Sequence, residues 1–184
     1  MRFFWKTVLS LFGWKTDILF PFPQLKKYII IVGPHTSNWD FMVLLAYRSI
    51  TKINRTRFLA KKELFDSPFG FIFRWLGGTP VDRKSANNVV DQVAAIFNAH
   101  ENFAIALSPE GTRKKVDKLK TGFYFIAKAA KVPIIMVGLD YKNKQALFSD
   151  PLYPSLDQAK DFETILNFFR PVQGKVPQKG MGHL

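Results

Sequence analysis

The sequence contains no cysteine, and histidine occurs only three times in 184 residues, as His35, His100 and His183. The absence of thiols excludes disulfide bonds and thiolate chemistry, and no two histidines have the spacing of a zinc motif. We therefore expect no metal centre built on Cys and His. No apolar run reaches the roughly 18 residues that a membrane-spanning helix requires, and no small-residue cleavage site follows the apolar N-terminus. We expect neither a spanning helix nor export.

Acidic residues are also scarce, since 14 Asp and Glu stand against 27 Lys and Arg, a formal net charge of +13. With 47% hydrophobic and 22% charged residues, the chain has the composition of one folded domain rather than of a disordered basic tail. A positive surface attracts nucleic acid, anionic lipid headgroups, acidic carrier proteins or phosphorylated small molecules. Basic residues concentrate in 52–62 and 113–131, although an ordinary solvated face explains such runs as well.

The first 16 residues contain no acid and are rich in aromatic side chains. Wound as a helix, most of their apolar residues fall within an arc of about 160°, with Lys6 opposite. Such a helix either lies in a membrane interface or packs on the core of its own domain, and its Trp and Lys content favours the interface. We predict an amphipathic anchor at 1–16, a folded domain at 17–170 and a loose basic tail at 171–184.

Short apolar runs bounded by Gly or Pro alternate with amphipathic segments along the rest of the chain. This pattern predicts strands at 28–33, 57–60, 79–81, 103–107, 133–139 and 145–148, and helices at 41–50, 67–76, 85–99, 121–131 and 156–169. The alternation indicates an α/β domain with a mixed, largely parallel sheet covered by helices on both faces. Because chemistry in such sheets gathers beyond the carboxyl ends of strands, the loops at 33–40 and 108–115 are the candidates for the site.

The first loop places His35 after a strand and Asp40 in the first turn of the next helix. From that position the Asp40 carboxylate can reach back to one imidazole nitrogen, which fixes the tautomer and raises the basicity of the other nitrogen. A general base near neutral pH requires this arrangement. Ser37 and Asp40 also have the spacing of a capping box, in which the carboxylate only satisfies backbone donors. The two roles are compatible.

The second loop reads Ser-Pro-Glu-Gly-Thr-Arg at 108–113. Glu110 and Arg113 on a glycine-containing turn offer an acceptor, a guanidinium fork and backbone N–H groups, which suit a phosphate joined to hydroxyls. An ordinary turn with a surface ion pair is the alternative.

Other polar and aromatic residues are weaker signals by themselves. Arg83 follows a third predicted strand, and Lys61 or Lys62 either contacts phosphate or is simply solvated. The aromatic residues of 65–75 either line an acyl-chain groove or pack in the core.

Taken in order, the motifs resemble the phospholipid/glycerol acyltransferase family, which includes the lysophosphatidic acid acyltransferases. The family's H-x-x-x-x-D block corresponds to 35–40, its Gly to Asp-Arg block to 78–83, its F-P-E-G-T-R block to 108–113 and its V-P-I-x-x-V block to 132–137. Pro34, Ser108 and Lys114 depart from the family pattern, which indicates a subfamily whose acceptor can differ.

The resemblance implies a glycerol-3-phosphate acyltransferase-like fold and acyl transfer from a thioester, acyl-CoA or acyl-carrier protein, to a lysophospholipid hydroxyl, most often that of 1-acylglycerol-3-phosphate. It implies His35 as general base with Asp40 as its partner, and no metal or cofactor beyond the thioester co-substrate. The substrate-binding residues would be Arg83, Glu110, Gly111, Thr112, Arg113 and Lys61 or Lys62. The short chain leads us to expect a peripheral enzyme on the cytoplasmic face of an anionic membrane, without the transmembrane helices of larger members.

The competing interpretation is a basic module that binds nucleic acid or anionic membrane without catalysis. No recognisable reader motif for RNA or DNA occurs in the sequence, so we expect no specific nucleic-acid partner. A family member that kept the fold and lost activity is a third possibility, which the intact His35, Asp40, Glu110 and Arg113 disfavour.

Overall fold

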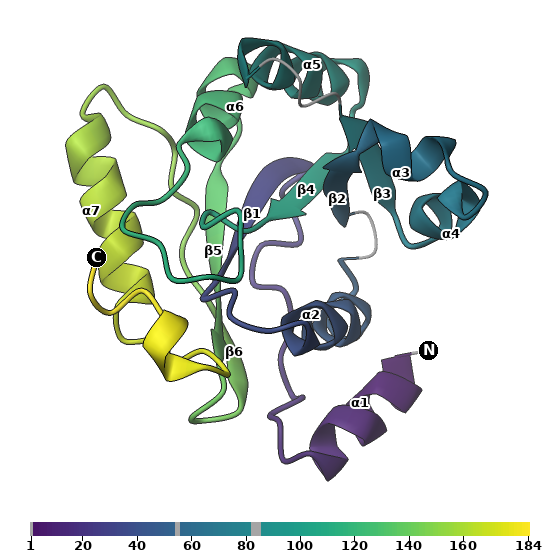
Figure 1. Cartoon of the computed structure of the whole chain (residues 1–184), viewed down its shortest axis with the longest axis vertical. Coiled ribbons are helices and arrows are strands. Elements are labelled where there is room, and N and C mark those ends of the chain that lie inside the picture. Colours follow the sequence, from purple (N-terminus) through teal and green to yellow (C-terminus); the bar gives the residue numbers. More distant parts are fainter. Residues whose placement is uncertain (1, 54–55, 82–85) are drawn as a thin grey trace.

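A six-stranded sheet, in the order β3-β2-β4-β1-β5-β6, runs through the middle of the molecule (Figure 1). The structure is a computed structural model that describes residues 2–53, 56–81 and 86–184. Neighbouring strands are parallel except for β5 and β6, which are antiparallel, so the predicted mixed, largely parallel sheet is confirmed. The strands are β1 (Lys27–Gly33), β2 (Thr56–Lys61), β3 (Gly78–Val81), β4 (Phe103–Leu107), β5 (Ile134–Asp140) and β6 (Gln145–Phe148).

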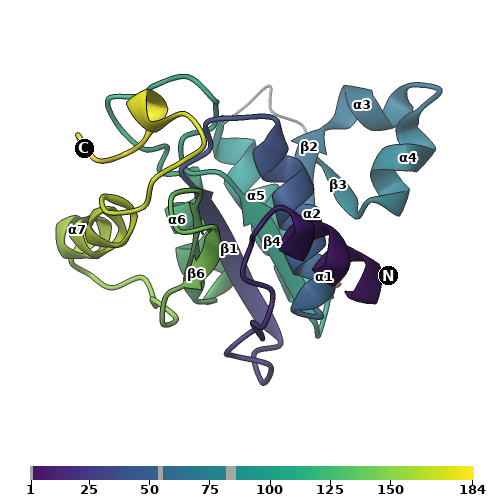
Figure 2. The same cartoon turned by 90° about the horizontal axis from the view of Figure 1, so that it is seen from below.

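Helices cover both faces of the sheet, as predicted (Figure 2). One face is covered by α1 (Arg2–Leu11) and α2 (Trp39–Ile50), and the other by α5 (Ala86–Ala99), α6 (Gly122–Ala130) and α7 (Gln158–Phe169). Two short helices, α3 (Lys62–Asp66) and α4 (Gly70–Trp75), form a hairpin between β2 and β3. None of the helices in the described parts of the chain is both long enough and apolar enough to cross a bilayer.

Strand β1 separates two hydrophobic cores. Its side chains alternate, so Ile29 and Ile31 pack toward α5, α6 and α7, while Ile30 and Val32 pack toward α1 and α2. All four are buried, and burial of each such side chain stabilises the fold by roughly 1.5–3 kcal/mol. The strand that leads into the His35 loop is therefore held firmly from both sides.

The helix predicted at 67–76 is shorter, since it begins only at Gly70 as α4, and the sequence analysis missed α3, which precedes it beyond a break at 67–69. Pro68 disfavours helical geometry at the residue before it and supplies no backbone donor. The chain then turns so tightly that a Cβ on Gly70 would lie 2.1 Å from the Phe65 carbonyl oxygen. Only glycine fits this contact, so the apolar pattern is divided between two helices.

The C-terminal segment 171–184, which the sequence predicts to be loose, packs against the domain. Val172 and Met181 are buried, and a Cβ on Gly33 would lie 2.2 Å from the Met181 Cε atom. The Tyr141 backbone N–H donates to the Gln173 carbonyl at 2.9 Å, and a short 3-10 turn, η1 (Pro177–Lys179), follows. Two apolar side chains thus anchor a segment whose Gly, Pro and Lys content predicts mobility.

The apolar residues of α1 lie on two faces of the helix, one buried against the domain and one exposed. Leu9 is buried and packs with Trp14 and α2 in the core beneath the sheet. Phe3, Phe4 and Leu11 point outward and are largely exposed. The helix therefore packs on its own domain and still presents an aromatic surface to its surroundings.

Candidate active site

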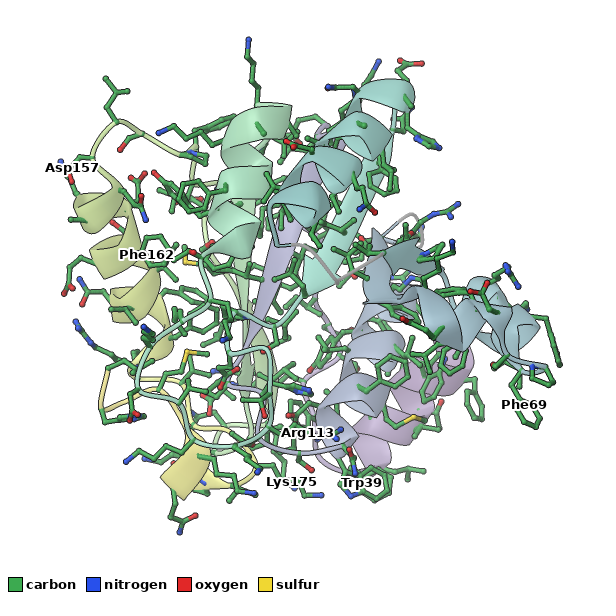
Figure 3. The ribbon with its side chains drawn as sticks, turned by 45° about the horizontal axis from the view of Figure 1, so that its top comes forward. Trp39, Phe69, Arg113, Asp157, Phe162 and Lys175 are labelled. Carbon is green, nitrogen blue, oxygen red and sulfur yellow. The ribbon has the colours of Figure 1, made fainter. Side chains whose placement is uncertain are left out.

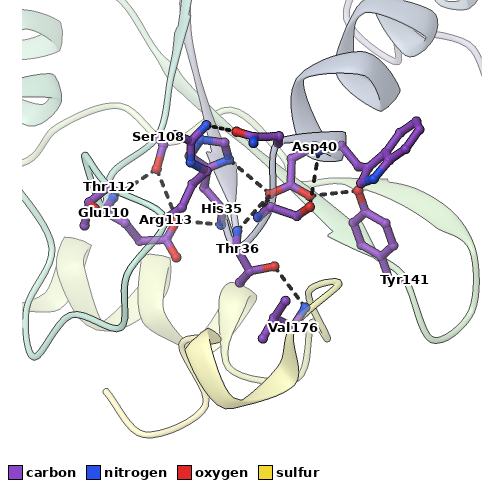
Figure 4. A network of polar contacts seen from close by, with 12 residues as sticks. His35, Thr36, Asp40, Ser108, Glu110, Thr112, Arg113, Tyr141 and Val176 are labelled. Carbon is purple, nitrogen blue, oxygen red and sulfur yellow. Dashed lines mark hydrogen bonds and ion pairs between the residues drawn. The ribbon is translucent and has the colours of Figure 1, made fainter.

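Sheet topology brings the two predicted loops together. Strands β1 and β4 are parallel neighbours, with Ile31 paired to Leu107, so the loops that follow them leave the same edge of the sheet. The His35 backbone N–H donates to a Glu110 carboxylate oxygen at 2.7 Å, although 75 residues separate the two (Figure 4). The loops at 33–40 and 108–115 therefore form one site.

His35 and Asp40 form the predicted imidazole–carboxylate pair. His35 Nδ1 lies 3.1 Å from Asp40 Oδ2. The His35 side chain is 26% exposed and lines a cavity, whereas that of Asp40 is 1% exposed. Because Nδ1 is engaged by the carboxylate, Nε2 is the nitrogen that remains for a substrate proton.

Further donors surround Asp40. Its Oδ2 accepts the backbone N–H groups of Thr36 and Ser37, each at 2.8 Å, and its Oδ1 accepts the Tyr141 hydroxyl at 2.7 Å. Burial works against the charge, but hydrogen bonds from His35, Ser37 and Tyr141 outweigh it and hold the pKa of Asp40 below its ordinary value. Asp40 is thus a charged partner for the imidazole near neutral pH.

The alternative capping role of Asp40 is present in the same geometry. The carboxylate accepts the Ser37 backbone N–H, as a capping residue does, while the Ser37 hydroxyl accepts the Trp39 N–H at 3.2 Å. Asp40 therefore performs both roles, because its Oδ2 atom accepts backbone N–H groups and also holds the imidazole in position.

Tyr141 is a site residue that sequence reasoning missed. It follows the last residue of β5, and β5 pairs with β1, which places the hydroxyl beside Asp40. Burial raises the pKa of Tyr141, and the bonded Asp40 carboxylate raises it further, so the phenol stays a donor. No local motif marks this residue, since its partner lies 101 positions away.

Glu110 lies under the His35 loop and does not face the cavity. It is 1% exposed, and its Oε2 accepts the His35 backbone N–H and, at 3.1 Å, the Ser108 hydroxyl. Burial raises the pKa of Glu110, against the opposing effect of these bonds. The sequence assigns this residue to substrate binding, whereas the geometry makes it a support for the loop that carries the base.

Arg113 joins the second loop to the start of α2. Its guanidinium donates to the Asn38 side-chain oxygen, and the residue lines the cavity together with Gly111 and Thr112; Arg113 and Gly111 are exposed and Thr112 is half-buried. Figure 3 shows Arg113 beside Trp39 and Lys175, whose Nζ lies 4.7 Å from the centre of the Trp39 ring. The alternative interpretation of this turn, a surface ion pair between Glu110 and Arg113, is not among the ion pairs of the described residues.

A cavity of about 1300 Å³ extends from this site. One end holds His35, Asp40 and the 111–113 segment. Its walls are mostly apolar and include Phe41, Leu44, Phe58, Val90 and Ile126. Besides Arg113, five further Lys and Arg residues line it: Arg48, Arg57, Lys114, Lys120 and Lys179. An apolar cavity with a cationic border suits an amphipathic anion.

Of the remaining predicted binding side chains, only that of Lys62 lies within the described structure. Lys62 is exposed at the start of α3 and does not line the cavity. Lys61 ends β2, and its side chain lies outside the described structure, as does the whole of Arg83. Lys120 and Lys179, which sequence reasoning did not select, occupy the cavity border instead.

Two curated relatives with the same name are similar to this chain in sequence. The protein called "Probable 1-acyl-sn-glycerol-3-phosphate acyltransferase" of Mycoplasma pneumoniae is 30% identical over 132 residues, which is 67% of this chain and 48% of that protein. The protein of the same name from Mycoplasma genitalium is 29% identical over 119 residues, 62% of this chain and 44% of that protein. The chain spans about half the length of the curated relatives it matches.

A solved structure and a family model complete the comparison. The crystal structure of the 1-acyl-sn-glycerophosphate acyltransferase from Thermotoga maritima superposes with a TM-score of 0.60 at 18% identity, covering 91% of this chain and 73% of that one. This likeness shows the fold. The model of the Acyltransferase family matches residues 20–140, a stretch that contains both loops of the site. With well over half of its length matched, the chain belongs to the acyltransferase family.

Proposed function

We propose that the protein moves a fatty acyl group from a thioester, acyl-CoA or acyl-carrier protein, to the free hydroxyl of 1-acylglycerol-3-phosphate or a closely related lysophospholipid. The observation that carries the proposal is the His35–Asp40 pair, with its carboxylate buried and its imidazole on a large apolar cavity. The names of the Mycoplasma relatives support the same acceptor.

In the proposed reaction, His35 Nε2 takes the proton of the acceptor hydroxyl as its oxygen attacks the thioester carbonyl carbon. Asp40 stabilises the imidazolium that forms. The tetrahedral intermediate then collapses, the carbon–sulfur bond breaks, and the imidazolium returns the proton to the departing thiolate. The products are an ester and a free thiol, and the step uses no metal or cofactor.

The oxyanion of that intermediate needs donors, and the first loop has few to offer. The N–H groups of His35, Thr36 and Ser37 are already bonded to the carboxylates of Glu110 and Asp40. We therefore assign oxyanion stabilisation to the 111–113 segment, which lines the same cavity as His35; its Gly111 N–H is bonded to the Ser108 carbonyl at 3.2 Å, so the assignment is to the N–H groups of Thr112 and Arg113.

The cationic border of the cavity suits the acceptor phosphate. Arg113 provides a planar guanidinium fork beside the base, and Lys120 and Lys179 add charge at the same cavity. The apolar walls would hold an acyl chain, which places the glycerol hydroxyl between phosphate and chain, near His35.

The same proposal makes the protein peripheral on the cytoplasmic face of an anionic membrane. The net charge of +13 attracts anionic headgroups, and the exposed Phe3, Phe4 and Leu11 of α1 suit an interfacial position. The chain thereby reaches an acceptor that resides in the bilayer.

The test is release of free thiol by purified protein, given acyl-CoA or acyl-carrier protein with a panel of lysophospholipids. We expect turnover that depends on both the acceptor and His35, and that His35→Ala abolishes. The matched control is His100→Ala, because His100 is exposed, its imidazole interacts with the Ile96 carbonyl and the Phe103 ring, and it does not line the cavity. Folded protein that releases no thiol with any pair of substrates would favour the non-catalytic binding module.

A further inference from the structure

The outer face of the α3–α4 hairpin carries three exposed aromatic side chains. Phe69 is 65% exposed, Phe71 66% and Trp75 76%. None of them lines the cavity, so they do not form the acyl-chain groove considered from the sequence, and none is part of the core. Contiguous exposed apolar surface of this kind marks an interaction site.

The hairpin that presents these aromatic residues is firmly anchored. Phe65 is buried and packs against Phe73, with 6.1 Å between ring centres, and both residues contact the position of Gly78 in β3. The Arg48 guanidinium of α2 donates to the Leu76 carbonyl at 2.7 Å. Two aromatic side chains thus hold the hairpin to the sheet while three others are exposed. Because the hairpin is well packed against the sheet, poor packing does not explain the exposure of the other three, which indicates an interaction surface.

The hairpin adjoins the mouth of the cavity. Arg48, which holds it, also lines the cavity, as do Phe41 and Phe58, whose rings meet edge-on at 5.8 Å. Phe41 and its neighbour Met42 are themselves exposed on α2. An apolar rim therefore continues from the hairpin onto the helix that borders the active site.

Helix α1 and the hairpin both lie toward the right of Figure 1, with α1 at the bottom below α2 and the hairpin above it beside β2 and β3. The hairpin carries two exposed cations, Lys62 and Arg74, and two exposed acids, Glu63 and Asp66, so the attraction to anionic lipid comes from the net charge of +13 of the whole chain. Exposed aromatic side chains on such a chain suit the headgroup boundary of an anionic bilayer, whereas two copies of the chain repel one another.

We propose that the α3–α4 hairpin is a second membrane-docking element, which inserts Phe69, Phe71 and Trp75 into the interface of an anionic bilayer. Together with α1 it sets the cavity mouth against the lipid from which the acceptor is drawn. The inference rests on the proposed function for the identity of the acceptor, but the docking itself is measured without turnover.

The experiment compares Phe69→Ser/Phe71→Ser/Trp75→Ser with Tyr153→Ser/Leu156→Ser. The control pair removes side chains that are 60% and 99% exposed next to Asp157, far from Phe69 in Figure 3. Flotation with phosphatidylglycerol-containing vesicles measures binding. Thiol release is followed with long-chain lysophosphatidic acid in those vesicles and with a short-chain, water-soluble analogue. We expect the hairpin variant to bind vesicles at least tenfold more weakly and to lose at least tenfold in kcat/KM for the acceptor presented in vesicles. Its kcat/KM for the soluble acceptor should stay within twofold of the parent value. The control pair should match the parent in all three measurements.

Unchanged flotation of the hairpin variant overturns the docking proposal, and so does a dimer of the parent chain that the substitutions dissociate. An equal loss on the soluble acceptor assigns the hairpin to catalysis instead. If the triple variant does not fold, the single variants Phe71→Ser and Trp75→Ser are measured in the same way. If neither the parent nor any variant releases thiol but flotation changes as expected, the proposed function is wrong and the docking proposal stands.

Discussion

Asp40 and Glu110 are both buried carboxylates at the carboxyl edge of the sheet, yet their pKa values move in opposite directions. Within the described structure Asp40 accepts four hydrogen bonds, from the imidazole, two backbone N–H groups and a phenol. Glu110 accepts two, from the His35 N–H and the Ser108 hydroxyl. The donors lower the pKa of Asp40 despite its burial, whereas burial raises the pKa of Glu110.

The difference separates two tasks within one site. Asp40 must be charged, because it stabilises the imidazolium that forms during the proposed reaction. Glu110 acts as a hydrogen-bond acceptor that holds the backbone of the base loop, a task that a neutral oxygen also performs. Burial alone therefore does not decide the state of a carboxylate; the donors around it do.

The largest expected effect comes from Asp40→Asn. The amide keeps the size of the side chain, but it replaces one acceptor oxygen by an NH2 group and removes the charge, so the imidazole loses both orientation and stabilisation. We expect kcat/KM for acyl transfer to fall by roughly 10³-fold, as in other sites that depend on an oriented imidazole. The measurement is thiol release at saturating donor with varied acceptor. Activity within tenfold of the parent would show that the charge is dispensable.

A pair of variants at Glu110 has the next largest effect. Glu110→Ala leaves the buried His35 N–H without an acceptor, and we expect a loss of roughly 100-fold in kcat, whereas Glu110→Gln keeps an acceptor oxygen and stays within about tenfold. Equal losses in the two variants would assign the charge, rather than the acceptor, to the reaction.

The Gln variant also tests the raised pKa of Glu110 through stability. A raised folded-state pKa contributes stability that is fully present below the unfolded value, near 4.5, and is lost as the pH rises through the folded value. At neutral pH the folded parent is therefore destabilised by the charged form of the buried Glu110 side chain, and Gln, which carries no charge, removes this destabilisation. We expect the Tm of Glu110→Gln to exceed that of the parent at pH 7, with a difference that shrinks toward pH 4.5. A difference that grows as the pH falls would contradict this sign.

Of the variants that remove a contact in the site, Tyr141→Phe is expected to have the smallest effect on kcat. It removes one of the four donors to Asp40, and a hydrogen bond to a charged group is worth about 1.5–3 kcal/mol. We expect kcat to fall by roughly tenfold with KM for the acceptor nearly unchanged, because Tyr141 does not line the cavity. A change confined to KM would place the phenol in substrate binding instead of in the support of Asp40.

Local features of the site follow from the sequence because they depend on neighbouring residues. His35 and Asp40 are five positions apart in one loop and helix start, so their spacing allows the contact that the structure contains, together with the capping role. Apolar runs of strand length likewise predict the strands and the two loops beyond them. In contrast, both the partner of Glu110 and the presence of Tyr141 depend on which strands lie beside β1.

The sequence by itself determined the α/β class, the family resemblance and the His35–Asp40 pair, since periodicity and short spacings encode them. Only the tertiary structure decided that Glu110 supports the His35 loop, that Tyr141 contacts Asp40 and that the C-terminal segment packs beneath Gly33. It also decided which aromatic residues of the α3–α4 hairpin point outward. The physical reason is that strand order and side-chain packing join residues far apart in the chain, and such pairings leave no local periodicity to read.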